Sequence, residues 1–313
     1  MKILLLNPNY IKRSNWGHQL FKNEFAKHHD VTYYGSGYSG FKQNLTVPQI
    51  LKRLKKKFDI ILTYESKYSK NFKGLGQITD IPKVLIQIDY AIGIKNYKGF
   101  ANTKNINPLI ISNKPDLIFF TSRSNVIAAK KEFKMKKIFP LPFSVDTNIY
   151  KNQNVNRPFD VMATFSTNNR VYPLRRKIQT ILKSMNIKTS TKRAIHQQYI
   201  NNINKSKIFV ISNNINKRLS MKYTEAMACG AMVLADEPED LDVQGFKRDQ
   251  HLVLYDGVAD LKQKIKYYLS HNAERNTIAK NGHNFVLNKH SCTKRVKQFT
   301  KIVKRELNIS RYF

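Results

Sequence analysis

Short apolar runs alternate with longer polar stretches along the first half of the chain. Because these runs lack a regular polar alternation, they are typical of strands that are buried on both faces of a parallel sheet. The expected strands of this half are Lys2–Leu6, Phe58–Thr63, Lys83–Ile88, Leu117–Thr121 and Ile138–Leu141. The polar stretches between them suit helices, so the pattern predicts an α/β fold.

The same pattern returns after the polar stretch 150–158, which contains a proline and is typical of a linker. The expected strands of the second half are Asp160–Phe165, Ile208–Ser212, Ala231–Ala235 and His251–Tyr255. The stretches 174–185 and 221–229 suit helices between them. We therefore predict two facing α/β domains, which cover residues 1–150 and 151–295.

A basic helix is expected over residues 296–313, at the end of the chain. Val296, Phe299 and Val303 recur at helical spacing on one face, and Lys297 and Lys301 lie on another. The apolar face suits packing on the protein, with a return to the first domain as one option. The basic face suits either solvent or a polyanion, and the basic run 52–57 allows the same two interpretations.

Composition limits the class of protein. The chain has 313 residues, of which 41% are hydrophobic, so a large globular core is expected. No apolar run reaches the roughly 18 residues of a membrane span, and the first residues lack the apolar core of a signal peptide, so we expect a cytoplasmic protein. Cys229 and Cys292 are too few for a structural zinc site or a disulfide framework, so no metal is expected.

The charge balance indicates the kind of partner. The chain has 55 Lys and Arg residues against 21 Asp and Glu residues, which gives a formal net charge of +34. A field of this size attracts polyanions, such as nucleic acid, an anionic membrane or an acidic polymer. A compositional drift towards lysine and asparagine is the plain alternative.

Candidate site residues follow the expected strands of the first half. Polar residues come directly after four of the runs, at 7–9, 64–66, 89–90 and 122–124. In open parallel sheets, ligands bind beyond the carboxyl ends of the strands. We therefore expect Glu65 and Asp89 to be among the residues that line a binding crevice.

A short helix with marked ends is expected between Ser220 and Gly230. Serine is a favoured N-cap residue, and glycine suits the position that follows a helix. Lys222 lies in the first turn, where the helix amides favour phosphate, and Glu225 falls on the same face. The two residues suit the diphosphate and the ribose of a nucleotide. An ion pair between them on the helix surface is the plain alternative.

The segment Lys222–Gly230 reads Lys-Tyr-Thr-Glu-Ala-Met-Ala-Cys-Gly and resembles the C-terminal domain of GT-B glycosyltransferases, in particular the spore-maturation-type branch of the group 1 enzymes. Those enzymes have a basic residue, Phe-Glu, three variable residues and Cys-Gly. The resemblance continues at Asp116–Ser122, Leu141–Asp146, Arg175–Arg176, Glu239–Leu241, His251–Asp256, Leu261, Ile265–Leu269, Gly282, His290 and Arg295. It implies the GT-B architecture, with two facing Rossmann-like domains and a C-terminal helical tail.

Three positions depart from the pattern of the family. Lys217 stands where the retaining branch has a glutamate that holds the sugar, so that role is not carried over. The triplet 165–167, Phe-Ser-Thr, replaces a Gly-Ser pair after the first strand of the second domain. Lys222 replaces an arginine, which keeps the charge and loses the bidentate geometry.

The resemblance implies transfer of a sugar from a nucleotide-sugar, with a UDP-sugar expected, to an acceptor hydroxyl, without a required metal or other cofactor. Lys222 and Arg218 are candidates for stabilising the leaving diphosphate, and Glu225 is the candidate for positioning the ribose. Further candidates for contacts to the phosphates are Ser166, Thr167 and Arg175, and Arg175 suits a solvent-facing position equally well.

An inverting reaction needs a base that takes the proton of the acceptor hydroxyl. The candidates in the first domain are Asp89, followed by Glu65 and His18. Each has a plain alternative, since Asp89 also suits the cap of a turn, Glu65 a pair with a lysine, and His18 an ordinary loop position.

We expect a polyanionic acceptor and favour hydroxymethylated DNA bases, because the basic residues occur in both halves. Virus-encoded transferases that glycosylate such bases are similar in architecture and charge. The alternative is a peripheral-membrane enzyme of cell-wall or surface glycan synthesis, which charge beside exposed apolar residues would favour. A non-catalytic protein that binds nucleotide or nucleic acid on the same fold is the alternative from another class.

Overall fold

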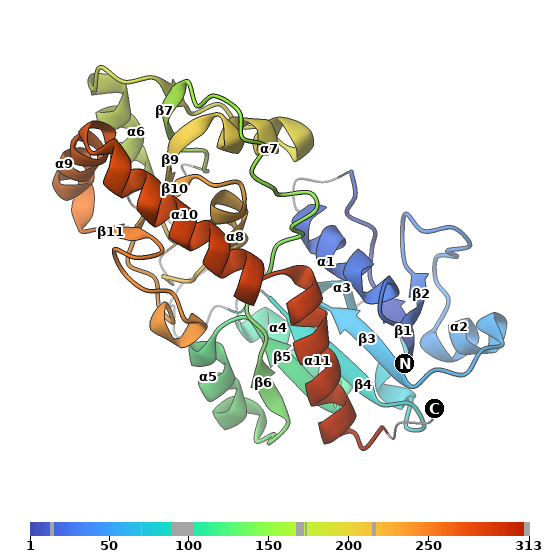
Figure 1. The fold of residues 1–313 in the computed structure, drawn as a ribbon. Helices are drawn as coiled ribbons and strands as arrows, with labels where there is room; N and C mark the ends of the chain where they lie inside the picture. The colour runs from blue at the N-terminus through green and yellow to red at the C-terminus, as the bar shows by residue number, and fades with distance from the viewer. Residues whose placement is uncertain are drawn as a thin grey trace. The chain divides into compact units, whose positions relative to one another are not determined.

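The computed structural model describes residues 1–12, 16–69, 71–88, 90, 103–166, 172, 174–214 and 217–309 (Figure 1). The chain forms two compact units, Met1–Pro142 with Arg295–Phe313 and Phe143–Lys294. The polar stretch 150–158 belongs to the second unit. Arg157 holds it there, because its guanidinium donates to the backbone carbonyls of Ser206 and Cys229 at 2.7 Å each. The first break in the chain therefore comes before the stretch that was expected as the linker.

The described residues of the first unit build a six-stranded parallel sheet, with the order β2-β1-β3-β4-β5-β6. Its strands are β1 (Lys2–Leu6), β2 (Asp30–Tyr34), β3 (Ile60–Tyr64), β4 (Lys83–Gln87), β5 (Leu117–Phe120) and β6 (Ile138–Pro140). In the register, Leu6 pairs with Tyr34 on one side and with Thr63 on the other. Because all strands run in one direction, the residues that follow β1, β3 and β4 emerge at the same edge of the sheet.

Helices cover both faces of this first sheet. They are α1 (Trp16–Ala26), α2 (Val47–Leu54), α3 (Ser66–Ser69), α4 (Thr103–Asn113), α5 (Arg123–Phe133) and most of α11 (Cys292–Glu306). Ile110 of α4 and Val126 of α5 pack with Ile118 of β5 on one face. On the other face, the Phe299 ring of α11 lies 4.9 Å from the Phe25 ring of α1. The local sequence starts these helices with recognisable signals, such as the capping box between Thr46 and Gln49 at α2.

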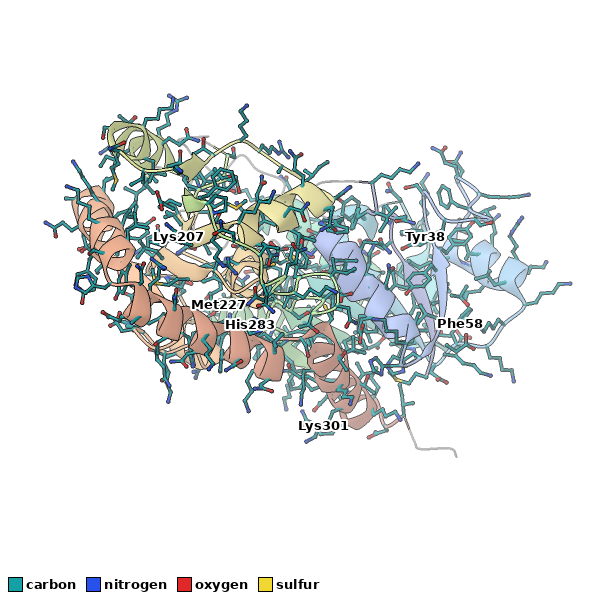
Figure 2. All side chains as sticks on the ribbon, turned by 45° about the horizontal axis from the view of Figure 1, so that its top comes forward. Tyr38, Phe58, Lys207, Met227, His283 and Lys301 are labelled. Carbon is teal, nitrogen blue, oxygen red and sulfur yellow. The ribbon has the colours of Figure 1, made fainter. Side chains whose placement is uncertain are left out.

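The terminal helix combines the two faces that its sequence indicates. Val296, Phe299 and Val303 are fully buried within the first unit, so the apolar face packs on the protein. Lys297 and Lys301 are exposed, and Lys301 is labelled in Figure 2. The helix is therefore a packed element with a basic outer face.

The second unit contains a five-stranded parallel sheet in its described residues, with the order β11-β10-β9-β7-β8. Its strands are β7 (Phe159–Met162), β8 (Thr189–Ser190), β9 (Ser206–Ile211), β10 (Met232–Asp236) and β11 (Val253–Tyr255). Its helices are α6 (Arg175–Ser184), α7 (His196–Asn204), α8 (Met221–Ala228), α9 (Gly257–Ser270) and α10 (Asn272–Lys289). The strand–helix alternation confirms the predicted α/β fold in both units.

Helix α8 lies buried between the second sheet and α10. His283 of α10 meets the carbonyl of Met227 at 3.1 Å, and Figure 2 labels both residues. Gly282 allows this close approach, because a Cβ atom there would lie 2.4 Å from the carbonyl oxygen of His251. The ends of α8 are as predicted: Ser220 is the N-cap residue, and Gly230 has a φ of +76° that suits glycine.

Two strands were not predicted from the sequence. The edge strand β2 is only partly buried and carries Asp30 and Thr32, so it lacks a continuous apolar run. Strand β8 has only two residues. Within the described part of the chain, the helices are too short or too polar to cross a membrane.

Candidate functional site

Arg175 lies at the carboxyl end of the second sheet, as the first residue of α6. Its guanidinium donates to the carbonyl of Ser212 from Nη2 at 2.7 Å and from Nε at 3.0 Å. Nη1 donates to the carbonyl of Ser166 at 3.2 Å. The guanidinium carbon also lies 3.3 Å from the centre of the Tyr172 ring, a cation–π contact. One buried cation thereby joins the segments that follow β7 and β9.

Lys222 adds a second cation beside Arg175. Its Nζ donates to the carbonyl of Thr164, just after β7, at 2.6 Å. Desolvation lowers the pKa of Lys222 to about 8, and the nearby charges of Arg175 and Arg193 act in the same direction. We call Arg175, Arg193 and Lys222 the cationic cluster. Among the described residues, neither Arg175 nor Lys222 is paired with a carboxylate, so no direct ion pair neutralises either charge.

Glu225 follows Lys222 on α8 and is 7% exposed. The Tyr199 hydroxyl of α7 donates to Oε2 at 3.1 Å, and the Tyr150 hydroxyl also bonds the carboxylate. Burial raises the pKa of Glu225, while the tyrosine bonds and the charge of Lys222 oppose that rise. The two tyrosines therefore fix the carboxylate beside the cationic cluster, in place of the surface ion pair with Lys222 that the sequence allowed.

A polar network that was not predicted from the sequence lies at the same end of the second sheet. Asp236, the last residue of β10, accepts the backbone N–H of Asn213 at Oδ1 (2.7 Å). The Asn213 side chain donates to the carbonyl of Asp236 at 2.7 Å and accepts from the Tyr223 hydroxyl at 3.0 Å. Burial raises the pKa of Asp236. The position of these residues after expected strands was the available signal, but it did not single them out.

The remaining candidates of the second unit differ in their exposure and in their contacts. Ser166 is exposed, and its carbonyl is held by Arg175. Arg218 is half-buried and forms an isolated parallel bridge with Glu239. Thr167 lies outside the described residues. The structure therefore brings Arg175, Lys222 and Glu225 together, and links Ser166 to them through its backbone.

Lys22 is the most unusual residue at the carboxyl end of the first sheet. It lies on α1 and is fully buried. Its Nζ donates to Asn7 Oδ1 and to the carbonyl of Pro8 at 2.7 Å each, and lies 4.1 Å from the centre of the Tyr10 ring. Burial lowers the pKa of Lys22 to about 7, against the opposing charge of Glu65. Lys22 was not predicted as a site residue, because a lysine on an amphipathic helix is usually solvated.

Glu65 follows β3 directly and is 2% exposed. Its Oε1 forms an ion pair with Lys67 Nζ at 2.7 Å. The backbone of Glu65 has a φ of 62°, in the left-handed region that non-glycine residues seldom adopt. Strained conformations of this kind concentrate at functional sites, because the surrounding structure must hold them. The pairing with a lysine, which was the plain alternative for Glu65, is present together with this strain.

His18 lies on α1 and contacts the same group of residues. Its Nδ1 lies 3.0 Å from the Tyr64 hydroxyl, so the two form a hydrogen bond. Burial lowers the pKa of His18 to about 3, and the charges of Lys67 and Lys22 contribute to this shift. The imidazole is therefore neutral at ordinary pH. We call His18, Lys22, Glu65 and Lys67 the acid–base cluster.

Asp89, the first candidate base, lies outside the described residues. The structure therefore places two of the three predicted acid–base residues, His18 and Glu65, in one cluster. Within the described part of the chain, no three His, Cys, Asp or Glu side chains gather in an arrangement that suits a metal ion.

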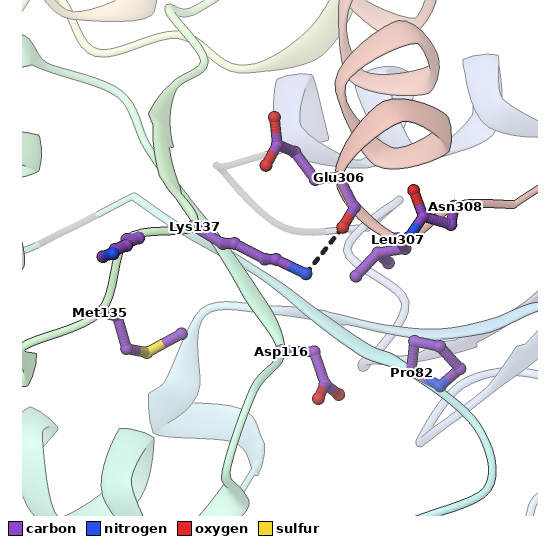
Figure 3. Close-up of a pocket in the computed structure, with 8 residues that line it drawn as sticks. Pro82, Asp116, Met135, Lys137, Glu306, Leu307 and Asn308 are labelled. Atoms are coloured by element: carbon purple, nitrogen blue, oxygen red, sulfur yellow. Dashed lines mark hydrogen bonds between the residues drawn. The ribbon is translucent and has the colours of Figure 1, made fainter.

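A separate pocket of about 440 Å³ lies at the opposite edge of the first sheet (Figure 3). Pro82, Asp116 and Lys137 line it from the segments that precede β4, β5 and β6, and Lys137 Nζ donates to the carbonyl of Glu306 at 2.7 Å. Ligands of open parallel sheets bind at the carboxyl ends of the strands. This pocket is therefore not part of the candidate site.

Comparison with known proteins agrees with the fold and gives a family match within the second half of the chain. Residues 175–301 match the family model described as "Glycosyl transferase-like". This span begins at Arg175 and contains Lys222 and Glu225. No curated protein matches the sequence closely enough to count as a relative.

Solved structures match the chain over nearly its whole length. Sucrose-phosphate synthase from Thermosynechococcus elongatus has a TM-score of 0.69 at 13% identity, with 99% of this chain and 100% of that chain covered. Anabaena HepE in complex with UDP has a TM-score of 0.69 at 14% identity, with 97% and 100% covered. The catalytic domain of starch synthase IV from Arabidopsis thaliana, bound to ADP and acarbose, has a TM-score of 0.68 at 10% identity, with 98% and 99% covered.

At these identities the structural likeness establishes the fold alone, while the family match covers most of the second unit and residues 295–301 of the first. The narrower resemblance to spore-maturation-type enzymes stays a prediction. The chain therefore has the fold of GT-B glycosyltransferases, and residues 175–301, most of them in its second unit, are similar in sequence to the glycosyl transferase-like family.

Proposed function

We propose that the protein transfers a sugar from a UDP-sugar to an acceptor hydroxyl and that the cationic cluster holds the diphosphate of the donor. The observation that carries this proposal is the pair Arg175 and Lys222, which lies at the carboxyl end of the second sheet with neither charge neutralised by a described carboxylate. Both cations are anchored by backbone carbonyls and are therefore fixed before a ligand arrives. A preorganised cation site of this kind suits a phosphate better than it suits a neutral ligand.

The proposed reaction follows from the charges. The bond between the anomeric carbon of the sugar and the diphosphate oxygen breaks, and the bonding electrons leave with UDP. The acceptor oxygen forms the new bond to the anomeric carbon and loses its proton to a base. Because negative charge grows on the leaving diphosphate, Lys222 and Arg175 stabilise the transition state more than the bound donor.

The nucleoside is proposed to lie next to this diphosphate site. Glu225 is held by Tyr199 beside Lys222, which suits a hydrogen bond from a ribose hydroxyl to the carboxylate. The structures of Anabaena HepE were solved with UDP, with UDP and glucose, and with UDP-glucose, whereas the starch synthase IV domain holds ADP. We propose UDP, with Ser166, Thr167 and Arg218 as further contacts.

The base that accepts the proton is proposed to come from the first unit. Glu65 combines burial, backbone strain and a position after β3, so it is the strongest described candidate. His18 is neutral and is therefore able to accept a proton, but its low pKa makes it a weak base. Asp89 stays in the proposal from its sequence position alone.

The acceptor is proposed to be polyanionic, and the protein to act in the cytoplasm. The net charge of +34 supports DNA with hydroxymethylated bases, whose hydroxyl a transferase reaches by flipping the base. A glycan carried on an anionic membrane is the second candidate. A specific observation favours it, because α4 and α5 carry both exposed isoleucines and exposed lysines.

The proposal is tested by measuring nucleotide release from a panel of UDP-sugars and ADP-sugars. Hydroxymethylated duplex DNA, unmodified DNA and anionic vesicles with glycolipid serve in turn as acceptor. We expect one UDP-sugar to be turned over, with a mass gain of one sugar on the acceptor. Turnover of an ADP-sugar alone would contradict the donor assignment. Saturable UDP binding without any release would instead indicate the non-catalytic binding protein.

A further inference from the structure

Helices α4 and α5 form one layer on the first sheet. Ile106 and Ile110 of α4 and Val126 and Ala129 of α5 share one buried cluster with strands β4 to β6. A hydrogen bond also joins the two helices, from Asn107 Nδ2 to Glu132 Oε1 at 2.7 Å. The apolar residues that this layer needs for its own packing therefore point inwards.

The outer side of this layer carries apolar residues that the packing does not use. Ile111 of α4 is 63% exposed and Ile127 of α5 is 62% exposed. Among the described residues, these are the two most exposed large hydrophobic side chains of the protein. Pro108 of α4 is exposed as well. Contact of these two branched aliphatic side chains with water is unfavourable, so their transfer from water to an apolar phase lowers the free energy.

Exposed lysines lie on the same two helices as these isoleucines or directly after them. Lys130, Lys131 and Lys134 are exposed on α5 and at its end, and Lys114 follows α4. The two carboxylates nearby have partners, since Glu132 accepts from Asn107 and Asp116 pairs with Lys83 Nζ at 3.5 Å. The outer side of the layer therefore has a positive excess together with exposed aliphatic groups. We call Ile111, Lys114, Ile127, Lys130, Lys131 and Lys134 the α4–α5 face.

We propose that the α4–α5 face binds the surface of an anionic lipid bilayer. Lysines attract the negatively charged headgroups, and the isoleucines enter the boundary between headgroups and acyl chains. The phosphates of a nucleic acid backbone would bind the lysines equally well, but a nucleic acid backbone offers no apolar phase to the isoleucines. The combination of the two residue types thus favours a bilayer over DNA as the occupant of this face.

The binding proposal is tested by flotation of the full chain with vesicles of phosphatidylcholine, with and without phosphatidylglycerol. We expect binding to the anionic vesicles only. The double variant Lys130→Glu/Lys131→Glu should weaken it roughly tenfold or more, because it replaces two positive charges by two negative charges next to an anionic surface. The matched control is Lys262→Glu/Lys266→Glu on α9, which makes the same charge change on exposed lysines of the second unit. Equal weakening by the control would overturn the proposal, because net charge alone would then explain binding.

A fluorescent label tests whether the isoleucine position enters the bilayer. Both natural cysteines, Cys229 and Cys292, are buried, so an environment-sensitive thiol dye labels Ile127→Cys selectively in the folded protein. We expect a blue shift and brighter emission when anionic vesicles are added. The control dye is placed at Ile195→Cys, which is 45% exposed in the second unit, and should not respond. An unchanged spectrum at position 127 would overturn insertion.

Nucleic acid is the competing outcome. If duplex DNA binds the protein and the α5 double variant weakens that binding, while the vesicles fail to bind, the face is a nucleic-acid surface and the proposal is wrong. None of these measurements needs a donor or a turnover. Failure of the bilayer proposal is therefore distinguishable from failure of the proposed sugar transfer, which is read from nucleotide release.

Discussion

In the first unit, the carboxyl end of the sheet gathers two lysines, a strained glutamate and a neutral histidine. In the second unit, the corresponding end gathers two arginines and a lysine. Lys22 and Lys222 are held alike, by backbone carbonyls of segments that follow the first strand of each sheet. Their surroundings differ, since Glu65 lies near Lys22 and is itself paired with Lys67, whereas Glu225 is engaged by tyrosines.

Under the proposed function, this difference assigns two kinds of chemistry to one scaffold. A cation beside a paired carboxylate balances its charge within the protein and leaves groups suited to proton transfer. A cation anchored only by neutral carbonyls keeps its charge for an anionic ligand. In the proposed function, the scaffold sets the position of each group, and the nearest carboxylate decides whether that position is suited to proton transfer or to phosphate binding.

The largest effect is expected from removing the charge of Lys222. Lys222→Met keeps the length of the side chain but loses the cation, so kcat/KM for the donor should fall about 100-fold to 1,000-fold, the range seen when one electrostatic donor is removed from an active site. Lys264→Met is the control, because Lys264 also donates to a backbone carbonyl at 2.6 Å but lies on α9. Steady-state kinetics with thermal unfolding of both variants separate the two roles. An equal loss in the control would show that carbonyl anchoring, and not charge at the cluster, matters.

The second-largest effect is expected from Glu65. Its substitution should separate the acid–base cluster, which affects kcat, from the cationic cluster, which affects UDP binding. Glu65→Gln is close in shape and cannot accept a proton, so kcat should fall about 100-fold, as for a general base, while the dissociation constant of UDP stays unchanged. Calorimetric titration of UDP and turnover assays measure the two quantities. If UDP binding weakens as much as turnover, the acid–base cluster is not distinct in function from the cationic cluster. Lys67→Met serves as the companion variant, because it removes the ion pair and keeps the carboxylate.

A smaller effect is expected in the pH dependence of kcat/KM, which should report on Lys222 of the cationic cluster. Lys222 has a pKa of about 8 in the folded protein. As pH rises above this value the lysine loses its charge, so kcat/KM for the donor should fall by up to tenfold per pH unit. Lys222→Arg keeps its charge to higher pH, so its profile should stay level where that of the natural protein falls. A descending limb that is unchanged in Lys222→Arg would assign the titration to another group.

The sequence predicted the sheet cores well, because strands buried on both faces leave continuous apolar runs. It missed β2, an edge strand whose burial comes from one side and whose sequence is therefore mixed. It found Lys222 and Glu225 because helix-end signals and a family motif mark them. It did not find Lys22, Asp236 or Arg193, because each takes its role from neighbours that are distant along the chain. The hydrogen bond from Lys22 to Asn7, for example, joins residues 15 positions apart.

The smallest effect is expected in the stability of the first unit. His18 has a folded pKa of about 3 against an ordinary value of 6.5, so between these values the unfolded chain binds the extra proton. The free energy of unfolding is therefore unaffected by His18 above pH 6.5 and falls as pH drops towards 3. The slope from one such proton is about 1.4 kcal/mol per pH unit at most.

Substitution His18→Gln should remove this contribution and flatten the pH dependence of stability. His29 has a folded pKa of about 4 and remains in both proteins, so the difference between them isolates His18. Trp16 is the single tryptophan of the chain and lies on α1, so its fluorescence in urea titrations at pH 6 and pH 4 reports on the first unit. An identical loss of stability in both proteins between these pH values would mean that the imidazole accepts its proton in the folded state, and the acid–base cluster would then carry a positive charge that sets it closer to the cationic cluster.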